Sequence, residues 1–74
     1  MFCLEEAHYI ATKRRVIEAE ARIILQRALI SNLKRRGRAA ESGESLLRTM
    51  EEVLSMLQAH EEILRRSLIQ RGYL

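Results

Sequence analysis

The stretch Lys34-Arg35-Arg36-Gly37-Arg38-Ala39-Ala40-Glu41-Ser42-Gly43 decides how this chain folds. It holds two of the three glycines in a sequence of 74 residues that has no proline. Three cations precede Gly37, and cations are favourable in the last turn of a helix. Glycine readily takes the left-handed conformation just past a helix end. We therefore expect one helix to end near Arg36, with Gly37 at a positive φ.

The start of the second helix is marked less clearly. Ser42 could cap it, or the helix could begin near Ala39 or Ala40 and carry Gly43 inside. We favour the earlier start, because short connections usually join antiparallel helices. The prediction is an all-α fold, an antiparallel two-helix hairpin with helices over about 2–36 and 40–71, forming a single domain over residues 1–74.

The composition supports this fold class. Aromatic residues make up 4% of the chain, apolar residues 47% and charged residues 31%. A β-sandwich or barrel needs turn residues at short, regular intervals, and the absence of proline and the scarcity of glycine exclude one. The core must therefore be built from aliphatic side chains on long helices.

Each segment carries an apolar stripe with the alternating three- and four-residue spacing of packed helices. The first stripe comprises Phe2, Glu5, Tyr9, Thr12, Val16, Ala19, Ile23, Gln26, Ile30 and Leu33. The second comprises Leu47, Met50, Leu54, Leu57, Glu61, Leu64 and Leu68. If the chain reverses near Arg38, Gln26 faces Met50 and Glu5 meets Arg71 near the open end.

A second stripe on each segment has no partner inside a lone hairpin. We expect its residues to form a long exposed apolar strip, and soluble monomers rarely leave a large patch of this kind exposed. The simplest remedy is a homodimer that forms a four-helix bundle about a two-fold axis. A helix of another protein is the alternative partner. The predicted interface residues are Ile10, Ile17, Ala21, Ile24, Val53, Met56 and Ile63.

Residues that could support catalysis or bind a cofactor are sparse. Glu5 and His8 have the spacing of a di-iron ligand pair, which needs carboxylates at the same level of a facing helix. The second helix offers Ser67, Leu68 and Arg71 there instead. Cys3 is the only cysteine, so no intramolecular disulfide can form. We expect no enzyme activity, no cofactor and no metal site.

The charge balance leaves a second function open. The net charge is +3, and four cations gather around the turn: Lys34, Arg35, Arg36 and Arg38. These residues could contact an anion or a nucleic acid, although no aromatic residue interleaves with them to stack on bases. The acidic start of the chain is unlike a secretory leader, and the apolar runs are short. We expect a cytoplasmic protein without a membrane partner.

An ordered set of residues resembles a group of short uncharacterised helical proteins of alphaproteobacteria, rhizobia and their relatives. The matching elements run from Tyr9-Ile10-Ala11 through Ile23-x-x-Gln26-Arg27-x-x-Ile30-x-x-Leu33 and Gly37 to Leu46-Leu47-x-Thr49-Met50-Glu51-Glu52-x-Leu54 and His60. Those proteins tend to cap the second helix with Asp-Thr, whereas this chain has Ala39-Ala40, so the resemblance implies a ragged start here. It implies no activity.

Taken together, the sequence predicts a non-enzymatic helical hairpin that acts through protein–protein contacts and is its own partner. The alternative is a small basic regulator that binds nucleic acid through the turn.

Overall fold

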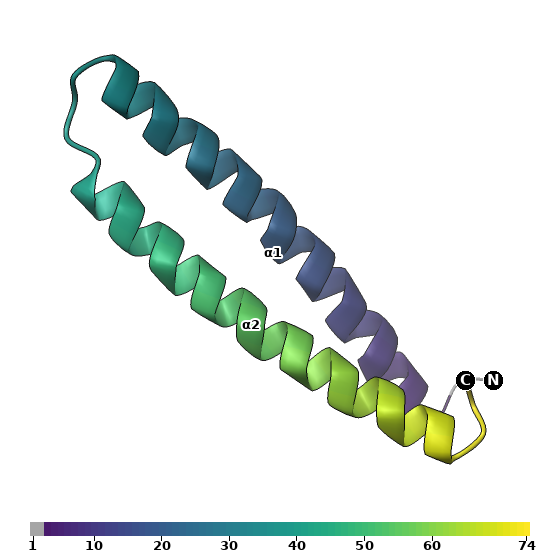
Figure 1. Ribbon diagram of the computed structural model, residues 1–74. Helices are drawn as coiled ribbons and strands as arrows, with labels where there is room; N and C mark the ends of the chain where they lie inside the picture. Colours follow the sequence, from purple (N-terminus) through teal and green to yellow (C-terminus); the bar gives the residue numbers. More distant parts are fainter. Residues whose placement is uncertain (1–2) are drawn as a thin grey trace.

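The chain forms two long antiparallel helices in a computed structural model that describes residues 3–74 (Figure 1). Helix α1 spans Leu4–Arg35 and helix α2 spans Glu41–Gln70. The start of α1 and the end of α2 lie together, opposite the connection. The structure measures 54 × 18 × 14 Å. The predicted all-α hairpin is confirmed, and its predicted helix ends agree closely with the observed ones.

Both helices end in the same hydrogen-bonded motif, in which a glycine takes a positive φ. Gly37 has φ 67°, and the amide of Arg38 donates to the carbonyl of Leu33 at 2.9 Å. Gly72 has φ 82°, and the amide of Tyr73 donates to the carbonyl of Leu68 at 2.9 Å. These bonds satisfy carbonyls that a helix end leaves free. The prediction for Gly37 is confirmed, and the motif at Gly72 is an addition to it.

The two helices begin differently. The Sγ atom of Cys3 accepts a hydrogen bond from the amide of Glu6 at 3.3 Å and caps α1. Ala40 occupies the capping position of α2, where no side chain bonds to the helix. Gly43 therefore lies inside α2, as predicted from the earlier start, and Ser42 is not the cap.

A single line of residues on each helix forms the core between them. The buried residues of α1 are Thr12, Val16, Ile23 and Ile30, all from the predicted first stripe. Leu68 of α2 is fully buried. The other predicted residues of the α2 stripe are half-buried: Leu47, Met50, Leu54, Leu57, Glu61 and Leu64. Phe2, also placed in the α1 stripe, lies outside the described residues.

The register of the hairpin is fixed by contacts at both ends. Glu5 forms an ion pair with Arg71, as predicted, and accepts a hydrogen bond from the hydroxyl of Ser67 at 3.3 Å. Near the turn, the Gln26 side-chain amide donates to the carbonyl of Gly43 at 3.0 Å. The residue spacing predicts Met50 opposite Gln26 and does not predict this contact with Gly43. The missing Cβ at Gly43 lets Gln26 and Ile30 come close to the α2 backbone.

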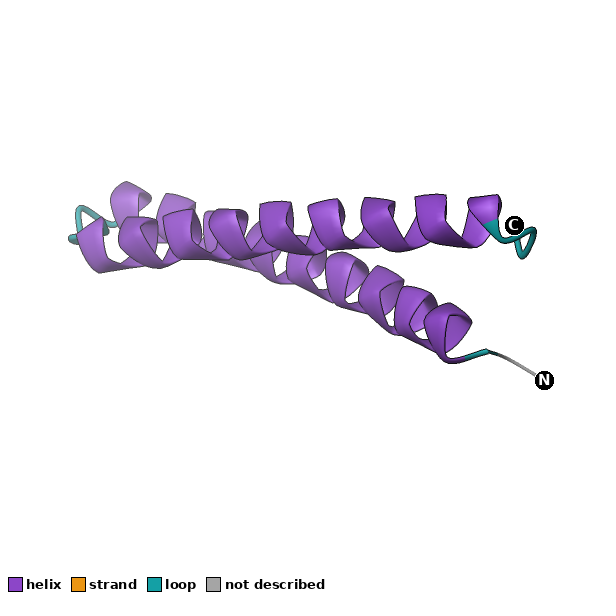
Figure 2. Ribbon diagram, turned by 90° about the horizontal axis from the view of Figure 1, so that it is seen from below, coloured by secondary structure: helices purple, strands orange, loops and turns teal. Residues whose placement is uncertain are grey.

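The helices do not lie strictly side by side along their whole length. The ribbons overlap near the open end in Figure 1 and near the turn in the view from below (Figure 2), so the helix axes cross at an angle. Contacts of Glu5 with Ser67 and Arg71 hold the helices together at the open end. This crossing is the usual result of packing side-chain ridges of one helix into grooves of the other.

Candidate interaction surfaces

Helix α1 presents a row of exposed apolar side chains in addition to its buried line. We name Ile10, Ile17, Ala21 and Ile24 the α1 ridge. Ile17 and Ile24 expose 64% and 65% of their surface, and Ile10 is also exposed. The isoleucines recur every seven residues and therefore lie nearly in a row. Lys13, Arg14 and Glu18 line a shallow groove with Ile10 and Ile17.

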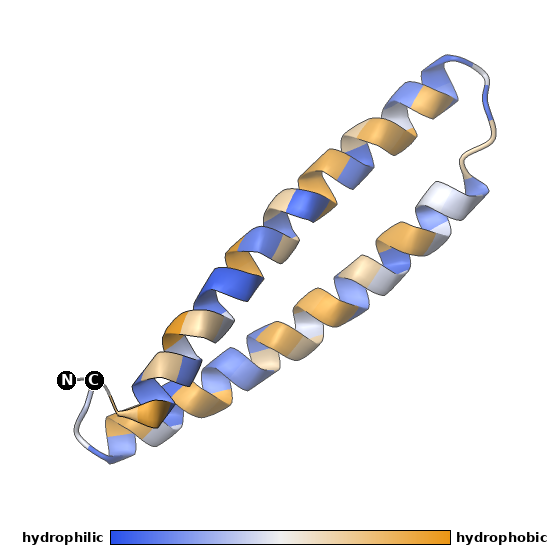
Figure 3. Cartoon of the chain, turned by 180° about the vertical axis from the view of Figure 1, so that it is seen from behind, coloured by the Kyte–Doolittle hydropathy of each residue, from blue (hydrophilic) through white to orange (hydrophobic). Residues whose placement is uncertain are grey.

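Helix α2 presents a matching row. We name Val53, Met56 and Ile63 the α2 ridge, of which Met56 and Ile63 are 71% and 65% exposed. Exposed Leu46 extends the row toward the turn. Apolar positions therefore recur along both helices and not only where the helices meet (Figure 3). All seven residues of the predicted interface are on the surface of the hairpin.

The two ridges lie on opposite faces of the hairpin, which follows from their offset from the core. On α1, Ile24 directly follows buried Ile23, so the ridge lies about 100° beyond the core line. On α2, Val53 directly precedes half-buried Leu54, so the ridge lies about 100° short of it. In an antiparallel pair of helices, residues that both follow, or both precede, the core positions lie on the same face of the hairpin. The α1 ridge follows its core positions and the α2 ridge precedes them, so the two ridges lie on opposite faces.

Two surface grooves at the same level of the hairpin agree with this geometry. Ile24 lines one of them with Ile23, Glu20, Arg27, Glu51, Leu54 and Ser55. Val53 lines the other with Ala19, Arg22, Thr49 and Met50. The two grooves share no lining residue, because they lie on opposite sides of the core between the helices. The seven residues therefore do not form the single strip that the sequence analysis assumed for a four-helix bundle.

The helices carry opposite net charges. Helix α1 has seven Lys and Arg residues and four Glu residues, a net charge of +3. Helix α2 has six Glu and three Arg residues, a net charge of −3. The remaining cations lie at the helix ends and in the connection: Arg36, Arg38 and Arg71. The hairpin therefore has a cationic edge and an anionic edge.

Ion pairs join these unlike helices. The guanidinium of Arg27 donates to a carboxylate oxygen of Glu51 at 3.0 Å, and the Nζ of Lys34 lies 3.2 Å from a carboxylate oxygen of Glu44. All these side chains are largely exposed, and exposed pairs contribute about 0–1 kcal/mol each. They favour the observed register more than they add to stability.

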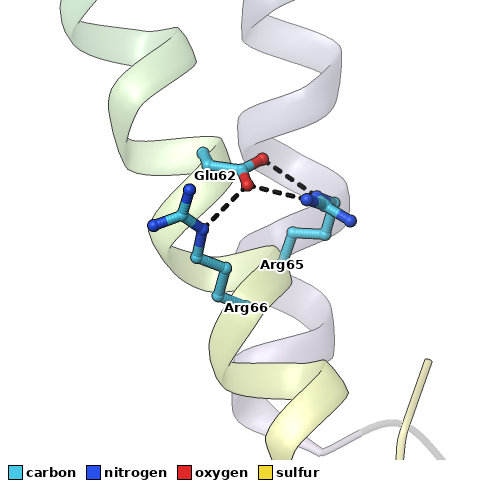
Figure 4. Close-up of polar contacts among 3 residues, drawn as sticks. All are labelled: Glu62, Arg65 and Arg66. Atoms are coloured by element: carbon cyan, nitrogen blue, oxygen red, sulfur yellow. Dashed lines mark hydrogen bonds and ion pairs between the residues drawn. The ribbon is translucent and has the colours of Figure 1, made fainter.

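A further charge cluster lies within α2 (Figure 4). The Arg65 guanidinium makes two hydrogen bonds to the Glu62 carboxylate, at 2.7 and 2.9 Å, and Arg66 makes one at 2.9 Å. The hydrogen bonds from Arg65 are the largest cause that lowers the pKa of Glu62 to about 2; loss of solvation opposes them, and the hydrogen bond from Arg66 and the two positive charges lower the pKa further. The hydrogen bonds to the Glu62 carboxylate in turn raise the pKa of Arg65. Both groups are therefore charged throughout the neutral range.

The basic turn is only partly available to an external ligand. All four predicted residues are exposed, and Lys34 in addition pairs with Glu44 of α2. The four residues predicted as an anion contact thus divide into one that joins the helices and three, Arg35, Arg36 and Arg38, that form no ion pair among the described residues.

A fourth groove was not predicted from the sequence. His8, Ala11, Thr12, Arg15 and His60 line it, so the two histidines come from different helices. His8 directly precedes Tyr9, and His60 directly precedes Glu61, which both belong to the predicted core stripes. This shared position, one residue before the core, was the sequence signal that could have paired the histidines. The groove lining holds one cation, Arg15, and no carboxylate. It lies on the same face as the α2 ridge, because Val53 and His60 have the same offset.

No family model, curated protein or solved structure matches the chain. Neither α1 nor α2 combines the length and the apolar character that a membrane span requires. Within residues 3–74, no three His, Cys, Asp or Glu side chains are grouped so that they could hold a metal ion.

Proposed function

We propose that this protein acts by association, with a second copy of itself as the partner and a homodimer as the smallest assembly. The observation that carries the proposal is the exposure of large apolar side chains on the α1 ridge, with Ile17 and Ile24 about two-thirds exposed. A hairpin with one interface needs only one apolar line on each helix, and the ridges are additional to it.

The energetics favour association when several such residues act together. Full burial of an isoleucine side chain contributes about 1.5–3 kcal/mol. Association costs roughly 4–15 kcal/mol in lost freedom of the partners. One ridge residue cannot offset that cost, but the six large side chains of the two ridges can. The ridges lie on regular helices, so little further ordering is needed when they meet a partner.

The test is the substitution Ile24→Glu. A carboxylate on the ridge would have to be buried without a partner in the assembly, so the variant should separate the copies. Leu25→Glu is the comparison variant, because Leu25 is 71% exposed and lies a further 100° around α1, next to the small Ala21 and away from the ridge isoleucines. It should change association far less.

Light scattering over a concentration series measures the outcome. The natural chain should gain mass with concentration, and its stability should fall on dilution, because folding and association are linked. A natural chain that stays monomeric and equally stable at every concentration contradicts the proposal.

Nucleic-acid binding at the turn is the second candidate, supported by the exposed Arg35, Arg36 and Arg38. It would show as binding that weakens steeply with salt and is lost when these three arginines are neutralised.

A further inference from the structure

We infer that the hairpin assembles by packing its α1 ridge on the α2 ridge of the next copy, so that growth continues beyond two copies. The inference rests on the proposed self-association and specifies its geometry. Its basis is the position of the ridges on opposite faces.

Geometry is the first argument. A two-fold dimer joins one surface to its own copy, so it buries either two α1 ridges or two α2 ridges. The other pair stays exposed on the outer faces of that dimer. When an α1 ridge meets an α2 ridge, the pair of copies still exposes one ridge of each kind. Each end can then accept a further copy, which is the property of a head-to-tail interface.

Charge is the second argument. Two α1 helices side by side would bring together two net charges of +3, and two α2 helices would bring together two of −3. An α1 helix beside an α2 helix pairs unlike charges, as it already does within the hairpin. Locally, Lys13 and Arg14 lie beside the α1 ridge. Exposed Glu52 lies next to Val53 of the α2 ridge.

Side-chain size is the third argument. On α1, large and small residues alternate over Ile17, Ala21, Ile24 and Ala28. The α2 ridge with its neighbour His60 has the same four–three spacing but mostly large residues: Val53, Met56, His60 and Ile63. Large side chains of one helix can fill the spaces left by small side chains of the other. Two α2 ridges would oppose large residues to large residues.

The experiment mixes two variants, each with one ridge disabled. Ile24→Glu removes the α1 ridge, and Met56→Glu removes the α2 ridge. Both positions are mostly exposed in the hairpin, so each variant should keep its helix content by circular dichroism. Alone, each should need a concentration more than about tenfold higher to associate. Mixed in equal amounts, they should form a dimer with one copy of each, because each supplies the ridge that the other lacks.

Sedimentation velocity, with one variant carrying a mass tag, distinguishes the outcomes. The natural chain should form species larger than a dimer, and the mixture should stop at the mixed dimer. Gln58→Glu, at an exposed position about 200° around α2 from Met56, is the control that should still grow like the natural chain.

Two results overturn the inference and leave the proposed function intact. If Met56→Glu alone still dimerises, the interface joins two α1 ridges. If Ile24→Glu alone still dimerises, the interface joins two α2 ridges. In both cases the mixture shows no preference for the mixed dimer. A natural chain that never associates overturns both proposals.

Discussion

Helices α1 and α2 both contribute to the core between them, α1 with four buried residues and α2 with Leu68 and a half-buried stripe, and they present different surfaces to solvent. On α1 the ridge isoleucines directly follow core positions, and the helix is cationic. On α2 the ridge residues directly precede core positions, and the helix is anionic. The core line explains why the chain is a hairpin. The helices differ in where their ridge lies relative to the core and in the sign of their net charge. These two differences decide which faces of the hairpin are apolar and which pairings with a partner helix are electrostatically favourable.

The largest expected effect distinguishes the buried side of α1, which stabilises the hairpin, from its exposed ridge, which we propose binds a second copy. Ile23 is 3% exposed and its neighbour Ile24 is 65% exposed. Ile23→Ala removes buried methyl groups and leaves a cavity, which should lower the free energy of unfolding by about 2–4 kcal/mol at every concentration. Ile24→Ala should leave the dilute hairpin nearly as stable as the natural chain and weaken only its association.

Urea unfolding at low and high protein concentration measures both variants. Equal losses of stability for Ile23→Ala and Ile24→Ala in dilute protein would mean that α1 does not have separate buried and exposed apolar lines. The exposed ridge of α1 could then not be separated from its core.

A smaller effect is expected at the helix starts, where α1 is capped by Cys3 and α2 is uncapped at Ala40. A serine hydroxyl at Ala40 can accept a hydrogen bond from a free amide of the first turn. Ala40→Ser should therefore raise the free energy of unfolding by about 0.5–1 kcal/mol. Ala39→Ser, one residue outside the capping position, is the control. A lower melting temperature for Ala40→Ser than for the control would show that the nearly buried site cannot accept a hydroxyl.

The hairpin and its register were predictable from sequence because they depend on local patterns. The three–four spacing locates the core positions, and Gly37 after three cations marks the end of α1. The contact of Glu5 with Arg71 then follows from the length of the connection alone. These features need only helix geometry and the backbone freedom of glycine.

The faces of the ridges were harder to predict, although the information is present in the sequence. Both ridges were identified residue by residue. Their relation depends on whether Ile24 and Val53 follow or precede the core, combined with the reversal of α2 relative to α1. The groove of His8 and His60 was missed for the same reason. These residues are 52 positions apart, and they are seen to share a face only when their positions relative to the core are compared between the two antiparallel helices.

The capping of α1 was missed for a different reason. Cysteine is not among the residues that usually cap helices, because sulfur is a weak hydrogen-bond acceptor. The close approach of Gln26 to Gly43 was also not predicted. It depends on the missing Cβ of a glycine within a helix, where sequence reasoning registers only the cost to helix stability.

The smallest expected effect concerns the charges within α2. All the ion pairs that α1 makes in the described part of the chain reach across to the other arm, whereas Glu62 pairs with Arg65 and Arg66 of its own helix. Their hydrogen bonds lower the pKa of Glu62 from 4.5 to about 2. A carboxyl group whose pKa is lower in the folded state stabilises that state above its unfolded pKa. The contribution is therefore complete at neutral pH and is lost as the pH falls from about 4.5 to about 2.

Glu62→Gln should consequently unfold at a slightly lower urea concentration than the natural chain at pH 7, and the gap should close on acidification through this window. The effect is small because the group is exposed to solvent and salt screens it. Glu52→Gln, an exposed site on the same helix, is the control. A gap for Glu62→Gln that stays constant from pH 7 down to pH 2 would mean that the arginines do not hold this carboxylate in the folded hairpin. The cluster would then not help α2 to keep its helical form.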